Sequence, residues 1–203
     1  MDIDAFILIG GLSSRLGVDK ALVEFDGQPL APRSACIINA ALSPNSITFV
    51  ARTENQFTTG LFSALGHPVI ADLKPGFGAW SGLHAALIDT RSEWTFILAC
   101  DLPFVSRELL QLLRRSVMGD IDAVVPRQQD ELLQPLCVFY RKQPALALVE
   151  SFFVGQKPLP PLNAIFEDLK TRIVEADEYS GLPNAEKLFL NINTENDLAA
   201  ALS

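Results

Sequence analysis

Short apolar runs alternate with longer amphipathic stretches along almost the whole chain. A continuous apolar run bounded by turn residues is typical of a buried parallel strand, and apolar residues at every third or fourth position are typical of a helix. This alternation favours an α/β fold, because parallel strands need helical crossovers, which cover both faces of their sheet. We expect a single domain over residues 1–203, built as a three-layer α/β/α sandwich with a mostly parallel, Rossmann-like sheet.

The most convincing strand is the uninterrupted apolar and β-branched run 94–99. Similar but weaker runs predict strands at 5–9, 21–25, 46–51, 68–71, 122–126, 135–140 and 172–176, and Asp26-Gly27 is a turn signal after the second of these. Helical spacing predicts helices at 30–42, 55–65, 80–88, 109–117, 144–153 and 194–202, with Ser106 and Thr194 as N-caps. Glycine and proline predict loops at 72–78 and 155–164.

The net charge of −8 excludes a general basic surface for nucleic acid or anionic lipid. A polyanionic ligand would need a small positive pocket, helped by a metal ion. No apolar run approaches the roughly 18 residues of a membrane span. The start, Met1-Asp2-Ile3-Asp4, lacks the basic region of a signal peptide, so we expect a cytoplasmic protein without membrane or nucleic-acid partners.

Cysteine and histidine usage excludes further chemistry. The three cysteines (Cys36, Cys100 and Cys137) form no C-x-x-C pair, which excludes a zinc ribbon and a thioredoxin-type motif. We expect free thiols in a reducing compartment. With two histidines, His67 and His84, the chain cannot build a histidine-rich metal site, and it has no G-x-S-x-G nucleophile elbow.

Three polar clusters follow predicted strands: Gly10 to Lys20, Asp72 to Gly82, and Cys100-Asp101. Ligands of open α/β sheets bind outside the carboxyl ends of the strands, so we expect the three clusters to surround one crevice.

The first cluster has the features of a phosphate cradle. Gly10 and Gly11 let the backbone approach a ligand, Ser13 adds a hydroxyl donor, and Arg15 and Lys20 add positive charge. The segment matches neither a Walker A loop nor a dinucleotide fingerprint. The alternative is a glycine-rich turn with solvated charges.

The other two clusters offer carboxylates. Asp72 is placed to accept hydrogen bonds from ribose hydroxyls or a base edge, or else it is an ordinary turn residue. Asp101 follows a very apolar strand, where a carboxylate is costly to bury unless it is paired or liganded. Because Mg²⁺ prefers carboxylate and phosphate oxygens, Asp101 is a candidate magnesium ligand. Cys100 is interpreted as a packing residue rather than a nucleophile.

These motifs, in this order, resemble the molybdenum cofactor guanylyltransferases of the wider GT-A-like nucleotidyltransferase group. The resemblance implies transfer of GMP from GTP to molybdopterin, giving the molybdopterin guanine dinucleotide and pyrophosphate. It rests on the matching stretches Leu8–Lys20, Asp26–Leu30, Asp72, Gly78–Gly82, Cys100–Phe104, Gln134–Leu136 and Asn191–Thr194.

The resemblance also implies roles for individual residues. Leu8, Ile9 and Gly10 would give the guanine backbone contacts, and Asp72 would bind the nucleoside. Arg15, Lys20 and Asp101 would be catalytic, with Lys20 on the phosphates and Asp101 on Mg²⁺. The remaining candidates are Gly11, Ser13 and Gly82 on the nucleotide side, and Gln134, Asn191 and Asn193 on the acceptor side.

Two departures from the family pattern concern base recognition: Ile9 stands in place of the usual alanine, and Ala51-Arg52 where an asparagine is common. Both departures bear on base identity more than on reaction type. The alternatives to the guanylyltransferase are CTP with molybdopterin, an NTP with a sugar phosphate, or, in a different class, a catalytically silent nucleotide-binding module. Asn191 and Asn193 are alternatively a turn before the last helix. Transient contact with molybdoenzymes or cofactor-insertion proteins is a further implication of the resemblance.

Overall fold

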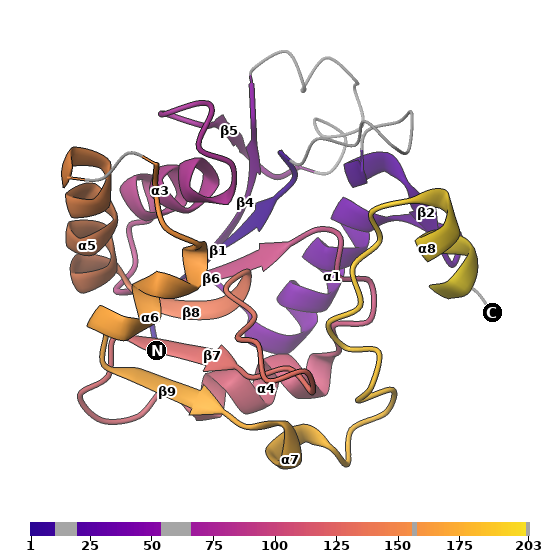
Figure 1. The fold of residues 1–203 in the computed structure, drawn as a ribbon. Coiled ribbons are helices and arrows are strands. Elements are labelled where there is room, and N and C mark those ends of the chain that lie inside the picture. Colours follow the sequence, from indigo (N-terminus) through magenta and orange to yellow (C-terminus); the bar gives the residue numbers. More distant parts are fainter. Residues whose placement is uncertain (11–19, 54–65, 156–157, 202–203) are drawn as a thin grey trace.

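The computed structural model describes residues 1–10, 20–53, 66–155 and 158–201. Seven strands form one sheet in the order β5-β4-β1-β6-β8-β7-β9 (Figure 1). Their bounds are β1 Ile3–Leu8, β4 Ser46–Ala51, β5 Val69–Ala71, β6 Trp94–Ala99, β7 Ala123–Pro126, β8 Cys137–Arg141 and β9 Thr171–Val174.

The sheet is mostly parallel, as predicted. Strand β1 pairs in parallel with β4 and β6, and β4 pairs in parallel with β5. Strand β8 runs antiparallel to both β6 and β7, whereas β7 and β9 are parallel. The parallel strands β5, β4, β1 and β6 therefore end at the same edge of the sheet.

Helices cover both faces of the sheet (Figure 1). Alternate side chains of β1 point to opposite faces, so that Ile7 belongs to one core cluster and Phe6 to the other. The first cluster includes residues of α1 (Leu30–Leu42) and α4 (Arg107–Arg115), and the second includes residues of α3 (Ala79–Asp89) and α5 (Lys142–Gly155). The expected three-layer sandwich is confirmed.

The predicted strand at 21–25 is wrong in its first half. Val23 N–H donates to the carbonyl of Lys20 at 3.1 Å, which closes a 3₁₀ turn, η1 (Lys20–Leu22), before the short strand β2 (Glu24–Phe25). The turn signal is confirmed, because Asp26 and Gly27 have φ of 51° and 74° and connect β2 to the antiparallel β3 (Gln28–Pro29).

The remaining elements are short. The predicted N-caps are confirmed, since Leu109 N–H donates to Ser106 Oγ at 3.2 Å and Asp197 N–H donates to Thr194 Oγ1 at 3.1 Å. The helix predicted at 55–65 lies outside the described residues. Elements not yet named are η3 (Leu162–Ala164), α6 (Ile165–Asp168), α7 (Ala176–Tyr179) and α8 (Glu195–Ala201).

All three cysteines are free, as expected. Burial raises the pKa of the Cys137 thiol, which fits a packing role. In the part of the chain that the structure describes, no helix has the length and apolar character needed to cross a membrane.

Asp4 ties the amino-terminal end of β1 to its neighbours. Its buried carboxylate accepts hydrogen bonds from Ser46 Oγ at 2.7 Å, Thr90 Oγ1 at 3.0 Å, and the backbone N–H groups of Arg91 and Ser92 at 2.8 and 2.9 Å. Burial alone would raise the pKa of Asp4, but these hydrogen bonds, that of Ser46 foremost, outweigh burial and lower it.

We expect Asp4→Ala to lower the free energy of unfolding by about 3 kcal/mol near neutral pH, because buried donors lose their charged acceptor. A lowered pKa in the folded state means that this stabilisation is present above the unfolded pKa of about 3.9 and is lost as the pH falls through the folded pKa. Urea unfolding at neutral and acidic pH measures both effects. Asp89→Ala, at an exposed helix end, is the control, and an equal loss in both variants would contradict the prediction.

Candidate functional site

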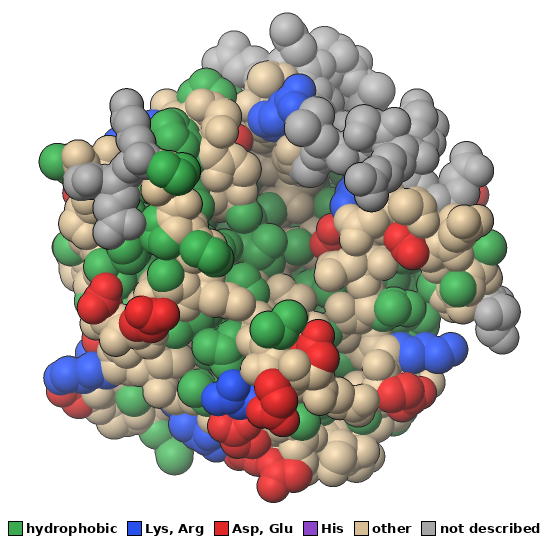
Figure 2. All heavy atoms as spheres, in the orientation of Figure 1, with side chains coloured by type: hydrophobic (Ala, Val, Ile, Leu, Met, Phe, Trp, Pro, Cys, Tyr) green, Lys and Arg blue, Asp and Glu red, His purple; other side chains and the backbone are tan. Residues whose placement is uncertain are grey.

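A cavity of about 280 Å³ opens where β1, β4 and β6 end. Figure 2 shows this hollowed face, with hydrophobic side chains in the hollow and acidic and basic side chains at its rim. The lining residues are Leu8, Gly10, Lys20, Val50, Arg52, Asp72, Gly76, Gly78, Ala79, Gly82, Ala99, Cys100, Asp101 and Leu136. All three polar clusters of the sequence contribute to this list, so the prediction that they surround one crevice is confirmed.

Lys20 and Asp101 form an ion pair in this cavity. Lys20 Nζ lies 3.0 Å from Asp101 Oδ2, and the two side chains are only 9% and 20% exposed. Turn η1 supplies the lysine and the end of β6 supplies the aspartate, 81 positions apart in the chain. A positive and a negative group are thus held together in a partly desolvated place, where charges interact more strongly than in water.

Asp101 is held by its backbone on two sides. Cys100 N–H donates to the carbonyl of Leu8 at 3.1 Å, which continues the pairing of β6 with β1, and Ile192 N–H donates to the carbonyl of Asp101 at 3.0 Å. The carboxylate after the apolar strand is therefore paired with Lys20, as its cost of burial requires, and the backbone around it is anchored to Leu8 and to Ile192.

A second carboxylate, Asp72, lines the same cavity at the end of β5. Its N–H donates to the carbonyl of Ala51 at 2.9 Å, which keeps it beside β4. Burial raises the pKa of Asp72 to about 6, and the nearby Arg52 guanidinium acts in the opposite direction. Arg52 also lines the cavity. In the sequence it stood out only as a departure from the family pattern, with no signal that it would reach the site.

Asp72→Asn is expected to raise the melting temperature at about pH 7.5, because it removes a carboxylate whose ionised form is disfavoured by burial. The folded chain holds a proton on Asp72 up to about pH 6, whereas the unfolded chain releases it near pH 4, so wild-type stability falls as the pH rises between these values. The gain of the variant should therefore shrink when the scans are repeated near pH 4.5. Equal gains at both pH values would contradict a raised pKa, and Asp89→Asn controls for general charge effects.

Two glycines line the cavity where an added Cβ would meet a neighbour, and the two positions tolerate it differently. A Cβ at Gly10 would lie 2.8 Å from the backbone nitrogen of Arg52, too close for any side chain without movement of β4. A Cβ at Gly82 would lie 3.2 Å from the Leu8 side chain, which is better able to adjust. Because neither residue carries a Cβ, a ligand in the cavity can approach the backbone closely at both positions.

The other predicted site residues differ in whether they line the cavity. Ile9 does not line the cavity: its side chain is fully buried in the core cluster of α1, and its N–H donates to the carbonyl of Val50 at 2.8 Å. The isoleucine in place of the usual alanine therefore adds no bulk to the cavity, and the backbone contact expected of Ile9 stays a prediction. Gln134 is buried, and its side-chain oxygen accepts from Leu136 N–H at 3.4 Å. Gly11, Ser13 and Arg15 lie outside the described residues.

The two asparagines before α8 differ in their contacts. Asn191 is exposed. The side-chain oxygen of Asn193 accepts a hydrogen bond of 2.5 Å from Lys20 Nζ, so this residue reaches the ion pair at the cavity. The turn before the last helix therefore contributes a side chain to the site. Nothing in its composition indicated which of the two residues would do so.

The described part of the chain contains no group of three or more His, Cys, Asp or Glu side chains that could hold a metal ion. Asp101 and Asp72 both line the cavity, and hydrogen bonds among the described residues reach only Oδ2 of Asp101. Mg²⁺ commonly binds one or two carboxylates together with substrate phosphates, whereas Zn²⁺ prefers nitrogen and sulfur ligands. The residues present thus fit Mg²⁺ brought with a phosphate ligand.

Comparison with known proteins matches residues 5–175 to the model of the MobA-like NTP transferase domain. A probable molybdenum cofactor guanylyltransferase of Methanosarcina acetivorans is 30% identical over 205 residues, covering 98% of this chain and 89% of the relative. A protein of the same description from Pelotomaculum thermopropionicum is 31% identical over 195 residues, covering 96% of this chain and 89% of the relative.

Solved structures agree with these matches. Molybdopterin-guanine dinucleotide biosynthesis protein A from Archaeoglobus fulgidus superposes with a TM-score of 0.77 at 27% identity, covering 98% of this chain and 96% of that one. A 4-diphosphocytidyl-2C-methyl-D-erythritol synthase from Anaerococcus prevotii gives a TM-score of 0.74 at 14% identity, over 99% and 94% of the two chains, and indicates a shared fold alone.

Proposed function

Because the chain belongs to the family of MobA-like NTP transferase domains, we propose that it transfers GMP from GTP to molybdopterin. The products are the molybdopterin guanine dinucleotide and pyrophosphate. The bond that forms joins the terminal phosphate oxygen of molybdopterin to the α-phosphorus of GTP, and the bond that breaks releases pyrophosphate.

The observation that carries this proposal is the Lys20–Asp101 pair beside the Gly10 backbone, in one cavity at the carboxyl end of the sheet. A metal–triphosphate ligand needs an ammonium group to bind its phosphate oxygens, a carboxylate to bind the metal ion, and a backbone that it can approach closely. The apolar floor formed by Leu8 and Val50 suits the flat face of a base.

The reaction needs little acid–base chemistry. A phosphate monoester has a second pKa near 6, so the attacking phosphate is largely dianionic at neutral pH and requires no general base. The described residues that line the cavity include no histidine. His84 of α3 is buried and is not among the lining residues. Burial lowers the pKa of His84, and the positive charge of Lys74 lowers it further.

Charge repulsion is the main obstacle. Two like unit charges about 4 Å apart repel by roughly 4 kcal/mol at an effective dielectric constant near 20. Lys20 offsets part of this repulsion by donating to phosphate oxygens, and it is well placed to follow the charge that moves onto the leaving pyrophosphate. Arg15 is proposed to add a second positive charge, and Gly11 and Ser13 to add donors.

Asp101 is the residue that we propose as the magnesium ligand, with Asp72 on the nucleoside. When bound, Mg²⁺ supplies Lewis-acid stabilisation of the charge on the phosphates. The chain contributes a carboxylate that Lys20 already holds at 3.0 Å, on a residue whose backbone carbonyl accepts from Ile192 N–H.

The nucleotide is tested with the four nucleoside triphosphates, each titrated calorimetrically with Mg²⁺ into the protein. We expect GTP to bind at least tenfold more tightly than CTP, ATP or UTP, and only GTP with molybdopterin to release pyrophosphate rapidly. A preference for CTP would reject the guanine assignment, turnover with a sugar phosphate would reject molybdopterin as the acceptor, and binding without turnover would leave a nucleotide-binding module.

The acceptor side and the cellular setting follow from the same proposal. Gln134, Asn191 and Asn193 are proposed to border the molybdopterin, and molybdoenzymes or cofactor-insertion proteins to receive the product by transient contact. Three free cysteines suit a reducing compartment, which supports the cytoplasm as the place of the reaction.

A further inference from the structure

The C-terminal segment 191–201 belongs to the site although the family model ends at residue 175. Ile192 and Ala201 pack with Val23, Phe25 and Leu30 in a small separate hydrophobic cluster. Figure 1 shows α8 beside β2. The segment is therefore docked against the turn that carries Lys20.

Lys20 is held by this segment as well as by β6. Its ammonium donates to Asp101 Oδ2 at 3.0 Å and to Asn193 Oδ1 at 2.5 Å. Two acceptors from different parts of the chain restrict a long side chain that would otherwise sample many rotamers. The direction of the ammonium thus depends on where Asn193 lies.

One carboxylate oxygen fixes the backbone at Asn193. Asp197 Oδ2 accepts the N–H of Asn193 at 2.9 Å and the N–H of Thr194 at 2.8 Å. In return, Asp197 N–H donates to Thr194 Oγ1 at 3.1 Å, which completes a reciprocal cap on α8. The hydrogen bond from Asn193 is also the largest of the causes that lower the pKa of Asp197, so the carboxylate is ionised at neutral pH.

We propose that Asp197 is a positioning residue of the nucleotide site, which holds Asn193 so that Lys20 is directed at the phosphates of the ligand. The inference rests on the proposed function, since it assigns phosphates to Lys20. The described hydrogen bonds that Asp197 accepts come from the backbone of Asn193 and Thr194, and the charge of Lys20 also contributes to lowering the pKa of Asp197. Without it, Lys20 keeps Asp101 but loses a fixed second acceptor.

The test measures binding of GTP and, separately, of inorganic tripolyphosphate, each with Mg²⁺. We expect Asp197→Ala to weaken both by roughly tenfold, as loss of a supporting hydrogen bond around a ligand-binding group commonly does. Asp197→Asn keeps an oxygen acceptor of the same shape and should restore most of the affinity. Circular dichroism verifies that each variant is folded.

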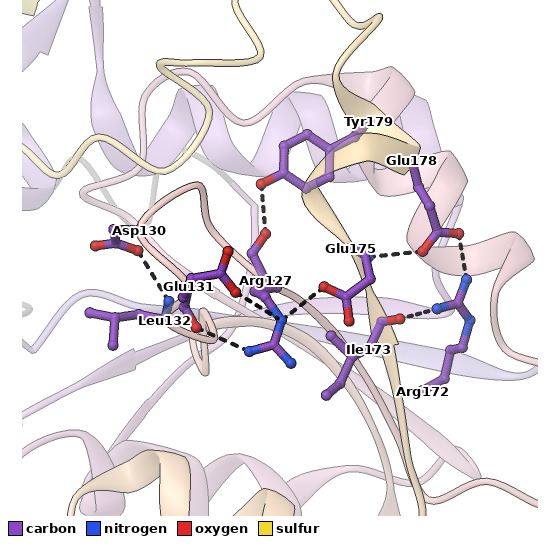
Figure 3. A network of polar contacts seen from close by, with 9 residues as sticks. All are labelled: Arg127, Asp130, Glu131, Leu132, Arg172, Ile173, Glu175, Glu178 and Tyr179. Atoms are coloured by element: carbon purple, nitrogen blue, oxygen red, sulfur yellow. Dashed lines mark hydrogen bonds and ion pairs between the residues drawn. The ribbon is translucent and has the colours of Figure 1, made fainter.

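A matched control is available in α7. Glu178 occupies the equivalent place in a second capping box, where its Oε1 accepts Glu175 N–H at 2.8 Å. Figure 3 shows this cap in a surface network with Arg172, and none of these residues lines the cavity. Glu178→Ala removes a helix cap in the same way, so we expect it to leave the affinity for both ligands unchanged.

A double-mutant cycle separates positioning from simple stabilisation. In a Lys20→Met background, Asp197→Ala should no longer weaken tripolyphosphate binding, because the group that it positions is gone. Wild-type affinity in folded Asp197→Ala, or an equal further loss in the Lys20→Met background, would overturn the inference. A third outcome separates the two claims. If the protein binds tripolyphosphate tightly and shows no preference for GTP, and Asp197→Ala still weakens that binding, the inference is supported and the proposed function is contradicted.

Discussion

Replacing Lys20 by methionine is expected to lower kcat/KM for guanylyl transfer by about a thousandfold, the size of effect seen when a preorganised donor is removed from a transition state. Methionine is unbranched and about as long as the apolar stem of the lysine, whose side chain is only 9% exposed, so the fold around η1 should persist. It leaves Asp101 without its ion-pair partner, and the incoming phosphates then meet an uncompensated negative charge. Steady-state kinetics with varied GTP measure the loss.

Lys170 provides the matched control for this substitution. It forms an ion pair with Asp120 at 2.5 Å, but both side chains are largely exposed, at 64% and 77%. Exposed pairs contribute little, about 0–1 kcal/mol, and Lys170 does not line the cavity. Lys170→Met should therefore keep its activity, and an active Lys20→Met enzyme would contradict the assignment of Lys20 to the phosphates.

The layers of the fold were predictable because they depend on long periodic stretches. The helix 30–42 and the strands 46–51 and 94–99 have the predicted bounds. Short elements were not predictable, since four residues at 165–168 or 176–179 contain barely one helical turn and show no period.

The site was predictable as far as topology alone determines it. Gly10, Asp72 and Asp101 follow parallel strands, and such strands end at one edge, so their convergence needed no side-chain detail. The contact of Asn193 with Lys20 joins residues 173 positions apart through a loop, and loop paths leave no periodic signal. The side chain of Ile9 points into the core although Leu8 and Gly10 line the cavity, because successive side chains of a strand face opposite sides.

Asp101→Asn is expected to lower kcat by several hundredfold at ordinary magnesium concentrations, and this effect distinguishes two roles for the carboxylate. Asparagine has the same shape, and its oxygen can still accept from Lys20 Nζ at about the present 3.0 Å. It has no charge, however, and a neutral amide is a poor substitute for a carboxylate beside Mg²⁺. Initial rates measured over a wide range of Mg²⁺ should show a lower maximum and a higher magnesium requirement.

The sign of the effect on GTP binding without metal provides the second half of the test. Removing a negative charge from a cavity that receives a polyanion should strengthen metal-free GTP binding, since that charge repels the phosphates and neutralises Lys20. If Asp101 served only to neutralise Lys20, the asparagine variant would bind GTP more tightly and turn over at least as fast. If Asp101 holds the metal, tighter metal-free binding must accompany slower turnover, and Asp120→Asn, at an exposed site, should change neither.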